Sequence, residues 1–290
     1  ASGQYLPTSY VLRLTSHLLR LTSYVSPLTS HVSRPVAHDQ MSTLHLEAEV
    51  QTLKTRHPFI IARGGKSEYR TVVVTLRDAD GLEGWGEAAG IPFYGETPET
   101  ALAALQTYAT ALPDHAFDLE AAERRFESAL SGNPGARSAL SAALHDLVGK
   151  RLGVPLWKLW GLDAANAPGS TFTIGLDTVE KMQAKVREAA EYPILKIKLG
   201  TERDLEILQG LRAVTDKELR VDANCGWTVK RAVQMLPVLE EFGVTVLEQP
   251  VAPGDLDGLG EVRRHSSLPV IADESCLVAA DIPALVGKVD

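Results

Sequence analysis

Hydrophobic and polar positions alternate with a period of two between residues 43 and 90. The segments 43–55 and 69–88 follow this pattern, and the second contains an Ala-Asp-Gly turn at 79–81. Such alternation is typical of antiparallel strands that bury one face. Between the two segments, 62–69 carries two adjacent glycines and is expected to form a loop.

Three helical patterns follow these strands. The first opens at Thr97 with the start signal Thr-Pro-Glu, and the third ends at Gly153 and Pro155. The helices are expected at 97–112, 119–130 and 135–153. Strands that are succeeded by helices predict an α+β domain, which we place at 41–165.

Beyond residue 166 short apolar strands alternate with helical patterns. The strands are expected at 170–176, 194–200, 219–227, 244–250 and 268–275. This βα order predicts a parallel sheet with covering helices, and a repeat of about 25 residues matches one unit of a (β/α)8, or TIM, barrel. The expected fold class is α/β: an α+β capping domain followed by a truncated TIM barrel at 166–290, with about five of the eight strands.

Charged residues stand at the ends of successive barrel strands. The second strand carries Lys196 and Lys198, and the next three end in Asp222, Glu248 and Asp273. The steps are 24, 26 and 25 residues (198 to 222, 222 to 248 and 248 to 273). The carboxyl ends of parallel barrel strands lie on one face, so these groups are expected to converge there.

The residue types point to metal-assisted proton transfer. Lys196 and Lys198 are two positions apart and share a strand face, and a lysine in the barrel interior is costly unless it is paired. The carboxylates of Asp222, Glu248 and Asp273 would repel one another without a cation, and their hard oxygen ligands suit Mg²⁺. A lysine beside a divalent cation has its ammonium form disfavoured and then serves as a base near neutral pH.

Each motif alone also has an ordinary structural explanation. Lys-x-Lys is more often a solvated face of an antiparallel strand, and Asp-x-Asn is usually a turn. Glu-Gln-Pro and Ala-Asp-Glu-Ser are weak signals individually. Their occurrence in order, on consecutive strand ends at barrel spacing, favours the functional interpretation.

Several motifs together carry a resemblance to a known family. They are Gly-Trp-Gly-Glu-Ala at 84–88, the segment 143–161, and the Lys-Ile-Lys, Asp-Ala-Asn, Glu-Gln-Pro and Ala-Asp-Glu-Ser of the strand ends. From about residue 43 to 290 the sequence resembles the enolase superfamily, in its muconate-lactonising-enzyme branch. The segments 91–100, 196–204 and 221–227 look most like dipeptide epimerases, which invert the α-carbon of the second residue of dipeptides such as Ala-Glu.

The resemblance implies a role for individual residues. Asp222, Glu248 and Asp273 match the three Mg²⁺ ligands. Lys198 matches the base that removes the α-proton of the substrate to form an enediolate, and Lys196 matches its electrostatic partner. The implied activity is Mg²⁺-dependent epimerisation of an Ala-Glu-like dipeptide.

Other residues receive supporting roles. Arg63, in the glycine-containing loop, is expected to hold a side-chain carboxylate of the substrate, and Thr171, at the start of the first barrel strand, to line the site. Asn224 and Glu274 are expected to orient their neighbours. Cys225 is interpreted as a packing residue, and the same interpretation applies to Cys276.

One feature departs from the family pattern. Epimerisation needs a base on each face of the planar intermediate, and the family takes its second lysine from the sixth strand. That strand is expected to begin at 287–290, where this sequence stops. A late Asp-x-Asp that holds the substrate amino group in many relatives is also absent. We interpret the chain as a fragment with exposed apolar strand edges, and expect negligible epimerase activity from it alone.

Two alternatives stay open at the level of sequence. A cycloisomerase or an o-succinylbenzoate synthase of the same superfamily would share the lysines and the ligands. A non-catalytic binding or scaffold protein on the same fold would not need them. The particular dipeptide is not determined, and a homo-oligomer is expected for the full-length protein.

Composition narrows the class of protein. The 290 residues are 44% hydrophobic and 23% charged, as in ordinary soluble globular proteins. The net charge of −8 argues against a nucleic-acid surface, and no apolar run approaches the roughly 18 residues of a membrane span. Two cysteines make no disulfide framework, so a cytoplasmic location is expected.

Residues 1–40 differ from the rest because Thr-Ser motifs recur there at a period of seven. The preferred interpretation is translated repetitive DNA upstream of Met41; a targeting segment or a functional repeat are the alternatives. In each case a disordered or non-native leader is expected.

Overall fold

The computed structural model describes residues 44–290, so the expectations for residues 1–40 fall outside its described part. The chain divides into two compact units. In the described residues, the first unit holds the chain up to Lys54 and Glu68–Ala165, and the second holds Thr55–Ser67 and Asn166–Asp290. The sequence pattern predicts a capping domain over all of 41–165, whereas the structure groups Thr55–Ser67 with the barrel strands.

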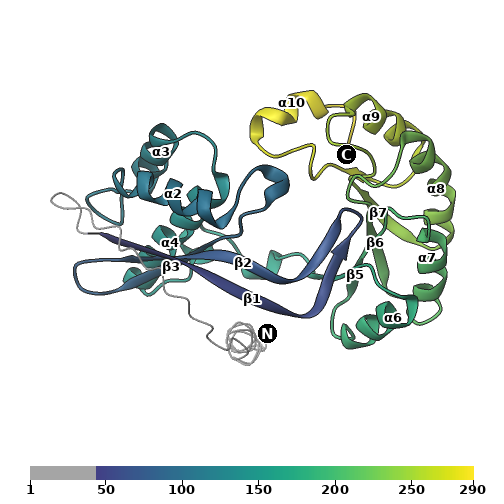
Figure 1. The fold of residues 1–290 in the computed structure, drawn as a ribbon, viewed down its shortest axis with the longest axis horizontal. Coiled ribbons are helices and arrows are strands. Elements are labelled where there is room, and N and C mark those ends of the chain that lie inside the picture. Colours follow the sequence, from purple (N-terminus) through teal and green to yellow (C-terminus); the bar gives the residue numbers. More distant parts are fainter. Residues whose placement is uncertain (1–43) are drawn as a thin grey trace, which may run out of the picture. The chain divides into compact units, whose positions relative to one another are not determined.

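A three-stranded sheet and a set of helices build the first unit (Figure 1). The strand order is β1-β2-β3, and β3 pairs antiparallel with β2. The elements are β1 (His45–Ile61), β2 (Gly64–Arg77), β3 (Glu83–Ala88), η1 (Pro92–Tyr94), α2 (Pro98–Ala109), α3 (Leu119–Ala129), α4 (Pro134–Leu152) and α5 (Leu156–Leu159). Along the sequence, η2 (Ala164–Asn166) follows them.

Local sequence signals explain the ends of these helices. Thr97 and Thr100 form a reciprocal capping box at the start of α2, with Pro98 in its first turn. Gly153 ends α4 with φ of 65°, a left-handed conformation that glycine adopts without steric cost. The loop expected at 62–69 is instead mostly strand, because β1 and β2 continue to a short turn at residues 62–63.

Two glycines of β3 allow α4 to pack directly on the sheet. A Cβ added to Gly86 would lie 1.9 Å from the carbonyl oxygen of Ala139, and one added to Gly84 would lie 2.0 Å from that of Ala143. Both distances are far below van der Waals contact. The glycines of the Gly-Trp-Gly-Glu-Ala motif therefore serve the packing of this unit.

The second unit is a five-stranded parallel sheet in the order β4-β5-β6-β7-β8. Figure 1 shows α6, α7, α8 and α9 along one side of it. The elements are β4 (Thr171–Ile174), α6 (Val179–Glu188), β5 (Ile194–Lys198), α7 (Asp204–Arg212), β6 (Glu218–Asp222), α8 (Val229–Glu241), β7 (Val244–Glu248), α9 (Leu256–His265), β8 (Val270–Ile271), η3 (Ala279–Asp281) and α10 (Ile282–Leu285).

Apolar side chains of this sheet and its helices form one core. Ile197, Val221 and Leu247 are fully buried in neighbouring strands and contribute to it. Ile197 stands between Lys196 and Lys198 in β5, and alternate residues of a strand project to opposite faces, so the two lysines project from the face opposite to Ile197. The observed strand order confirms the predicted partial TIM barrel.

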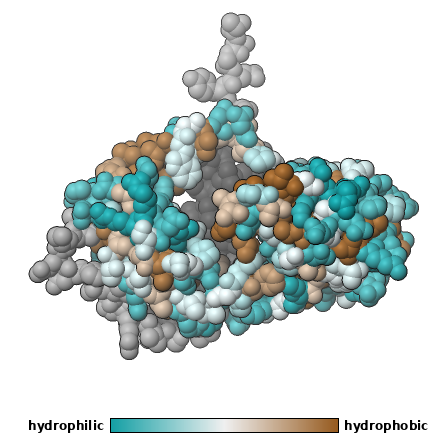
Figure 2. Space-filling view, turned by 90° about the horizontal axis from the view of Figure 1, so that it is seen from above, coloured by the Kyte–Doolittle hydropathy of each residue, from teal (hydrophilic) through white to brown (hydrophobic). Residues whose placement is uncertain are grey.

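The described sheet ends at β8, whose outer side is apolar. A surface hollow of about 550 Å³ lies beside it, lined among others by Ile271, Cys276, Leu285 and Val289. Hydrophobic residues also gather over the segment that contains η3 and α10 (Figure 2), where Ile282 is 55% exposed. The sequence led us to expect an exposed apolar strand edge, but the backbone N–H and oxygen of Val270 in β8 bond to Asp290 and its side chain is buried; of the two residues of β8, only Ile271 is exposed. None of the helices within residues 44–290 combines the length and apolar character that a bilayer span requires.

Candidate active site

Strand register brings the predicted site residues to one end of the parallel sheet. Lys198 of β5 lies opposite Asp222 of β6, and Asp222 lies opposite Glu248 of β7. Side chains at equivalent positions of neighbouring strands project on the same face of a sheet. The regular spacing of these residues in the sequence therefore becomes a row of charged groups at the carboxyl ends of three strands.

The three predicted ligand carboxylates form one cluster. Each of Asp222, Glu248 and Asp273 offers an oxygen atom within 4.8 Å of those of the other two. Asp222 is buried, Glu248 is half-buried and Asp273 is exposed. A set of three carboxylates at the mouth of a parallel sheet fits Mg²⁺, which prefers hard oxygen ligands and keeps several of its waters.

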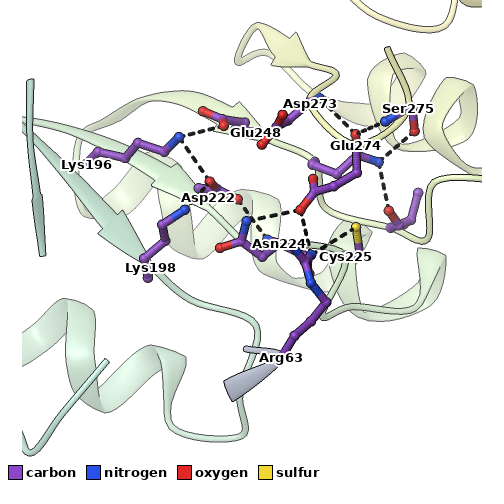
Figure 3. A network of polar contacts seen from close by, with 12 residues as sticks. Arg63, Lys196, Lys198, Asp222, Asn224, Cys225, Glu248, Asp273, Glu274 and Ser275 are labelled. Atoms are coloured by element: carbon purple, nitrogen blue, oxygen red, sulfur yellow. Dashed lines mark hydrogen bonds and ion pairs between the residues drawn. The ribbon is translucent and has the colours of Figure 1, made fainter. Parts of the chain in front are cut away.

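Both lysines of β5 contact this cluster. Lys198 Nζ donates a hydrogen bond to Asp222 Oδ2 at 2.6 Å. Lys196 Nζ lies 3.0 Å from the same oxygen and donates to Glu248 Oε1 at 2.5 Å. Figure 3 shows the two ammonium groups pointing from β5 toward Asp222. The expected pairing of two amines with neighbouring acids is thus present.

The cluster shifts the pKa values of its members in different directions. Burial alone would lower the pKa of Lys196, but the hydrogen bond to Glu248 and the negative charges of Asp222 and Glu248 raise it. Burial alone would raise the pKa of Asp222, but the two lysines hold that pKa below its usual range. Burial raises the pKa of Glu248. Asp273 is exposed as a whole residue, but partial desolvation of its carboxyl group, together with the charges of Glu274 and Asp222, raises its pKa.

These shifts describe a site with more negative charge than its two lysines neutralise. The carboxyl groups of Glu248 and Asp273 hold their protons more strongly first because burial disfavours their charged forms, and then because other carboxylates lie close by. A divalent cation among the three acids would relieve this repulsion. The electrostatics therefore agree with the ligand geometry.

Arg63, at the tip of the β1–β2 hairpin, reaches a second polar cluster in the same unit. Its Nη1 donates to Glu274 Oε1 at 2.5 Å and to the backbone oxygen of Asn224 at 2.8 Å. The Glu274 side chain is 1% exposed, and Asn224 Nδ2 also donates to its Oε1. Figure 3 shows Arg63 directed at Glu274. A substrate carboxylate would compete with this buried acid for Arg63.

Asn224 and Cys225 line the same region. Asn224 N–H donates to Asp222 Oδ1 at 2.8 Å, which fixes the second oxygen of that acid. Both residues have positive φ angles, 44° and 65°, so the chain turns sharply after β6. Burial and the nearby Glu274 raise the pKa of the Cys225 thiol to about 12.

Thr171 is not brought to this group of residues. It lies at the amino end of β4, opposite Ile194, whereas the site forms at the carboxyl ends of the strands. The register places Thr173, not Thr171, level with Lys196. The prediction put Thr171 at the start of its strand, where the structure also has it, but the start of a parallel strand lies away from the carboxyl ends at which the carboxylates meet, so its role in lining the site stays a prediction.

Two further buried polar residues in this region were not singled out from the sequence. Asp204 is fully buried and accepts hydrogen bonds from the N–H groups of Gly200 and Thr201 and from the indole of Trp227. It thereby fixes the loop that follows Lys198. Gln249, the second residue of Glu-Gln-Pro, is also fully buried. Its only signal in the sequence was its place within that motif.

Comparison with known families identifies the two parts of the chain. Residues 46–161 match the mandelate racemase / muconate lactonizing enzyme N-terminal domain. Residues 177–288 match the enolase C-terminal domain-like family. A capping domain joined to a parallel sheet with a carboxylate metal cluster defines an enolase-type protein.

Curated relatives narrow the class. An L-Ala-D/L-Glu epimerase from Bacteroides thetaiotaomicron is 39% identical over 237 residues, which cover 81% of this chain and 62% of that protein. An L-Ala-D/L-amino acid epimerase from a Maribacter species is 35% identical, with 82% of this chain and 70% of that protein covered. The chain belongs to the mandelate racemase / muconate lactonizing enzyme branch of the enolase superfamily, as predicted.

Solved structures agree with this assignment. The substrate-liganded L-Ala-D/L-Glu epimerase from Bacillus subtilis superposes with a TM-score of 0.80 at 27% identity, over 86% of this chain and 73% of that one. The dipeptide epimerase from Enterococcus faecalis, in complex with Mg and L-Leu-L-Tyr, superposes with a TM-score of 0.79 at 30% identity, over 87% of this chain and 73% of that one. The chain thus spans about two thirds to three quarters of these relatives, and less of the Bacteroides enzyme.

Proposed function

We propose that this site serves the epimerisation of a dipeptide through removal of the α-proton by a lysine. The observation that carries the proposal is the contact of Lys196 and Lys198 with a cluster of three carboxylates at one end of a parallel sheet. The sequence relatives with which the chain shares 35% to 39% identity are dipeptide epimerases. An Ala-Glu-like dipeptide is the first substrate to test.

Each lysine of β5 and the three acids has its own proposed role. Lys198 is the proposed base, because it is nearly buried and its amine is held beside Asp222. Lys196 bridges Asp222 and Glu248 and supplies positive charge next to the position of the substrate carboxylate. Mg²⁺, when held by the three acids, would stabilise the charge that develops on the carboxylate oxygens during proton removal.

Arg63 is the proposed contact of an acidic substrate side chain. Its side chain is 30% exposed, and its Nη1 is bonded to Glu274. The geometry of a guanidinium suits a carboxylate, since its N–H groups match two oxygens. Binding of an acidic dipeptide would then require Arg63 to share its charge between the substrate and Glu274.

We expect negligible epimerisation by the 290-residue chain alone. Inversion at the α-carbon requires a base on each face of the intermediate. In the described part of the chain, the lysines that contact the three carboxylates both lie on β5. Release of an inverted Ala-Glu at an ordinary enzymatic rate by this chain would contradict the expectation.

A chimeric enzyme tests the proposed function. Residues 44–290 would replace the aligned segment of the Bacteroides L-Ala-D/L-Glu epimerase, and α-proton exchange of L-Ala-L-Glu in deuterium oxide would be followed by NMR. We expect exchange and inversion in the presence of Mg²⁺, and loss of at least about 100-fold of the rate in the Lys198→Met chimera. If the Lys198→Met chimera exchanges the proton as fast as its parent, Lys198 is not the base.

The same assay separates the alternatives. A muconate lactonizing enzyme from Pseudomonas fluorescens also superposes with a TM-score of 0.79 at 27% identity, so the fold alone does not choose the substrate. A folded chimera that binds Mg²⁺ but exchanges no dipeptide proton would favour a cycloisomerase. Failure of the 290-residue chain to bind Mg²⁺ or Mn²⁺ would favour a non-catalytic protein.

A further inference from the structure

Asp273 differs from the other two members of the carboxylate cluster in how its backbone is held. Asp222 lies within the ladder of β5, β6 and β7. Glu248 is the last residue of β7 and pairs with both of its neighbouring strands. The β7–β8 ladder ends with Glu248 opposite Ile271, two residues before Asp273. The backbone oxygen of Asp273 accepts a hydrogen bond from the N–H of Cys276 at 2.9 Å, within its own loop, so a further contact must tie this loop to the neighbouring strand.

The side chain of Gln249 provides that contact. Its Oε1 accepts a hydrogen bond from the backbone N–H of Asp273 at 2.9 Å and another from that of Ser275 at 3.1 Å. Its Nε2 donates to the backbone oxygen of Val251 at 2.9 Å and to Ser275 Oγ at 2.8 Å. The carboxamide thus continues the hydrogen bonding of the two strands beyond the end of their ladder.

The carboxamide of Gln249 forms as many hydrogen bonds as its donors and acceptors allow. A carboxamide has two acceptor sites and two donor hydrogens, and all four have a partner here. The identity of the partners also determines which end is oxygen, because Oε1 faces N–H donors and Nε2 faces oxygen atoms. Gln249 is fully buried and has a φ of 34°, so the chain accepts an uncommon backbone conformation at this position.

We propose that Gln249 is a positioning residue that holds Asp273 in place for metal binding. The proposal rests on the proposed function, since it requires Asp273 to be a ligand. Gln249 directly follows one proposed ligand, Glu248, and its side chain holds the backbone of another proposed ligand, Asp273. It couples two members of the cluster while its own carboxamide is fully occupied by hydrogen bonds to other groups. Groups that orient metal ligands in this way typically account for a factor of about 10 to 100 in metal affinity.

Amide hydrogen exchange of the unmodified chain, without metal, is the first test. The N–H groups of Asp273 and Ser275 should exchange slowly, although the Asp273 side chain is exposed, because both are bonded to a buried oxygen. Exchange of both amides at the rate of an unstructured peptide would overturn the proposal. This outcome is independent of whether the site binds metal.

Substitution of the carboxamide is the second test. Gln249→Met keeps the length of the side chain and removes all four hydrogen bonds. We expect about 10-fold weaker Mn²⁺ binding, measured by electron paramagnetic resonance titration of the full chain, and rapid exchange of the Asp273 and Ser275 amides. Unchanged Mn²⁺ affinity in the folded variant would overturn the proposal.

Two further variants separate positioning from general stability. Gln249→Glu keeps an oxygen acceptor and should preserve slow exchange at Asp273 and Ser275, including in the case that Gln249→Met does not fold. Ser275→Ala removes the hydroxyl that joins Gln249 to Pro253 but keeps both N–H contacts. Its Mn²⁺ affinity should stay within about threefold of the parent. Equal losses in Ser275→Ala and Gln249→Met would reduce Gln249 to a structural role, and absence of Mn²⁺ binding by the parent would instead refute the metal site itself.

Discussion

The two units of this protein bury different kinds of side chain. The core of the first unit is almost entirely apolar and rich in alanine, and α4 rests on β3 through direct backbone contact at Gly84 and Gly86. The second unit has an apolar core of its own, yet it also buries Lys198, Asp222 and Glu274 near the ends of its strands.

This difference distinguishes apolar side chains that are buried for packing from charged side chains that are buried near a candidate site. Buried charges lower stability unless each finds a partner, and a protein retains them where they perform a function. In the second unit they are paired within a single network at the carboxyl ends of the strands. The first unit buries Glu96, whose carboxylate accepts hydrogen bonds from the N–H of Gly135, but among the described residues of this unit buried charges form no network of ion pairs. Substitutions in the two units should therefore lower stability for different reasons.

The largest effect is expected from removing charge at the centre of the second unit. Asp222→Asn leaves Lys196 and Lys198 with one fewer acid and takes one ligand from the cluster. Mn²⁺ affinity should fall by at least about 100-fold, which corresponds to about 2.7 kcal/mol. Asp257→Asn, at an exposed acid of α9, is the matched control. If the Asp222→Asn protein binds Mn²⁺ within threefold of the parent, the ligand assignment is wrong.

A steric change at the contact of β3 with α4 should lower the stability of the first unit. Gly86→Ala places a methyl group where the carbonyl oxygen of Ala139 lies, so β3 and α4 must separate. We expect a loss of about 1 to 3 kcal/mol in the free energy of unfolding, measured by urea titration with circular dichroism. Gly254→Ala, where a Cβ meets no atom within 4 Å, should change it by less than about 0.5 kcal/mol. Equal stability of both variants would refute the close packing.

A smaller effect is expected at the hairpin tip. Arg63→Met leaves the buried carboxylate of Glu274 with the amide of Asn224 as a remaining partner. Because Arg63 is partly exposed, we expect the free energy of unfolding to fall by about 1 kcal/mol. The double variant with Glu274→Gln should be less destabilised than the sum of the two single variants, as measured in a double-mutant cycle. Additive effects would show that the two side chains do not interact.

The smallest change concerns the reactivity of Cys225 and does not require any loss of stability. The thiolate is the reactive form, and the pKa of about 12 means that its fraction rises tenfold per pH unit through the neutral and mildly alkaline range. Alkylation by iodoacetamide, followed by peptide mass spectrometry, should therefore be slow at pH 7 and accelerate steadily as the pH increases.

Removal of the Glu274 charge offers a control for this prediction. That charge contributes to the raised pKa of Cys225, after burial, and Arg63 opposes it. Glu274→Gln should therefore lower the pKa of the thiol and speed its alkylation at a fixed pH. Fast labelling of the unmodified protein at pH 7 would contradict the buried, acid-flanked environment of Cys225.

Local patterns in the sequence predicted most of the fold. Each of the five parallel strands overlaps its expected range, because an apolar run with a charged end depends on neighbours along the chain. The observed strands are shorter: β6 ends at Asp222 instead of 227, and β8 is only Val270–Ile271. The same logic predicted that Asp222, Glu248 and Asp273 would meet, since equal spacing in βα units places equivalent residues side by side. These inferences needed only the geometry of a repeating unit.

Tertiary structure alone decided the contacts between residues distant in the sequence. The pairing of Arg63 with Glu274 joins positions 211 residues apart, and no sequence pattern near either residue predicts it. The role of Gln249 depends on where the loop of Asp273 passes, and only the register of β4 with β5 shows that Thr173, rather than Thr171, lies level with Lys196. Sequence periodicity specifies which face a side chain takes, whereas its partners follow from three-dimensional packing, in which every element constrains the others.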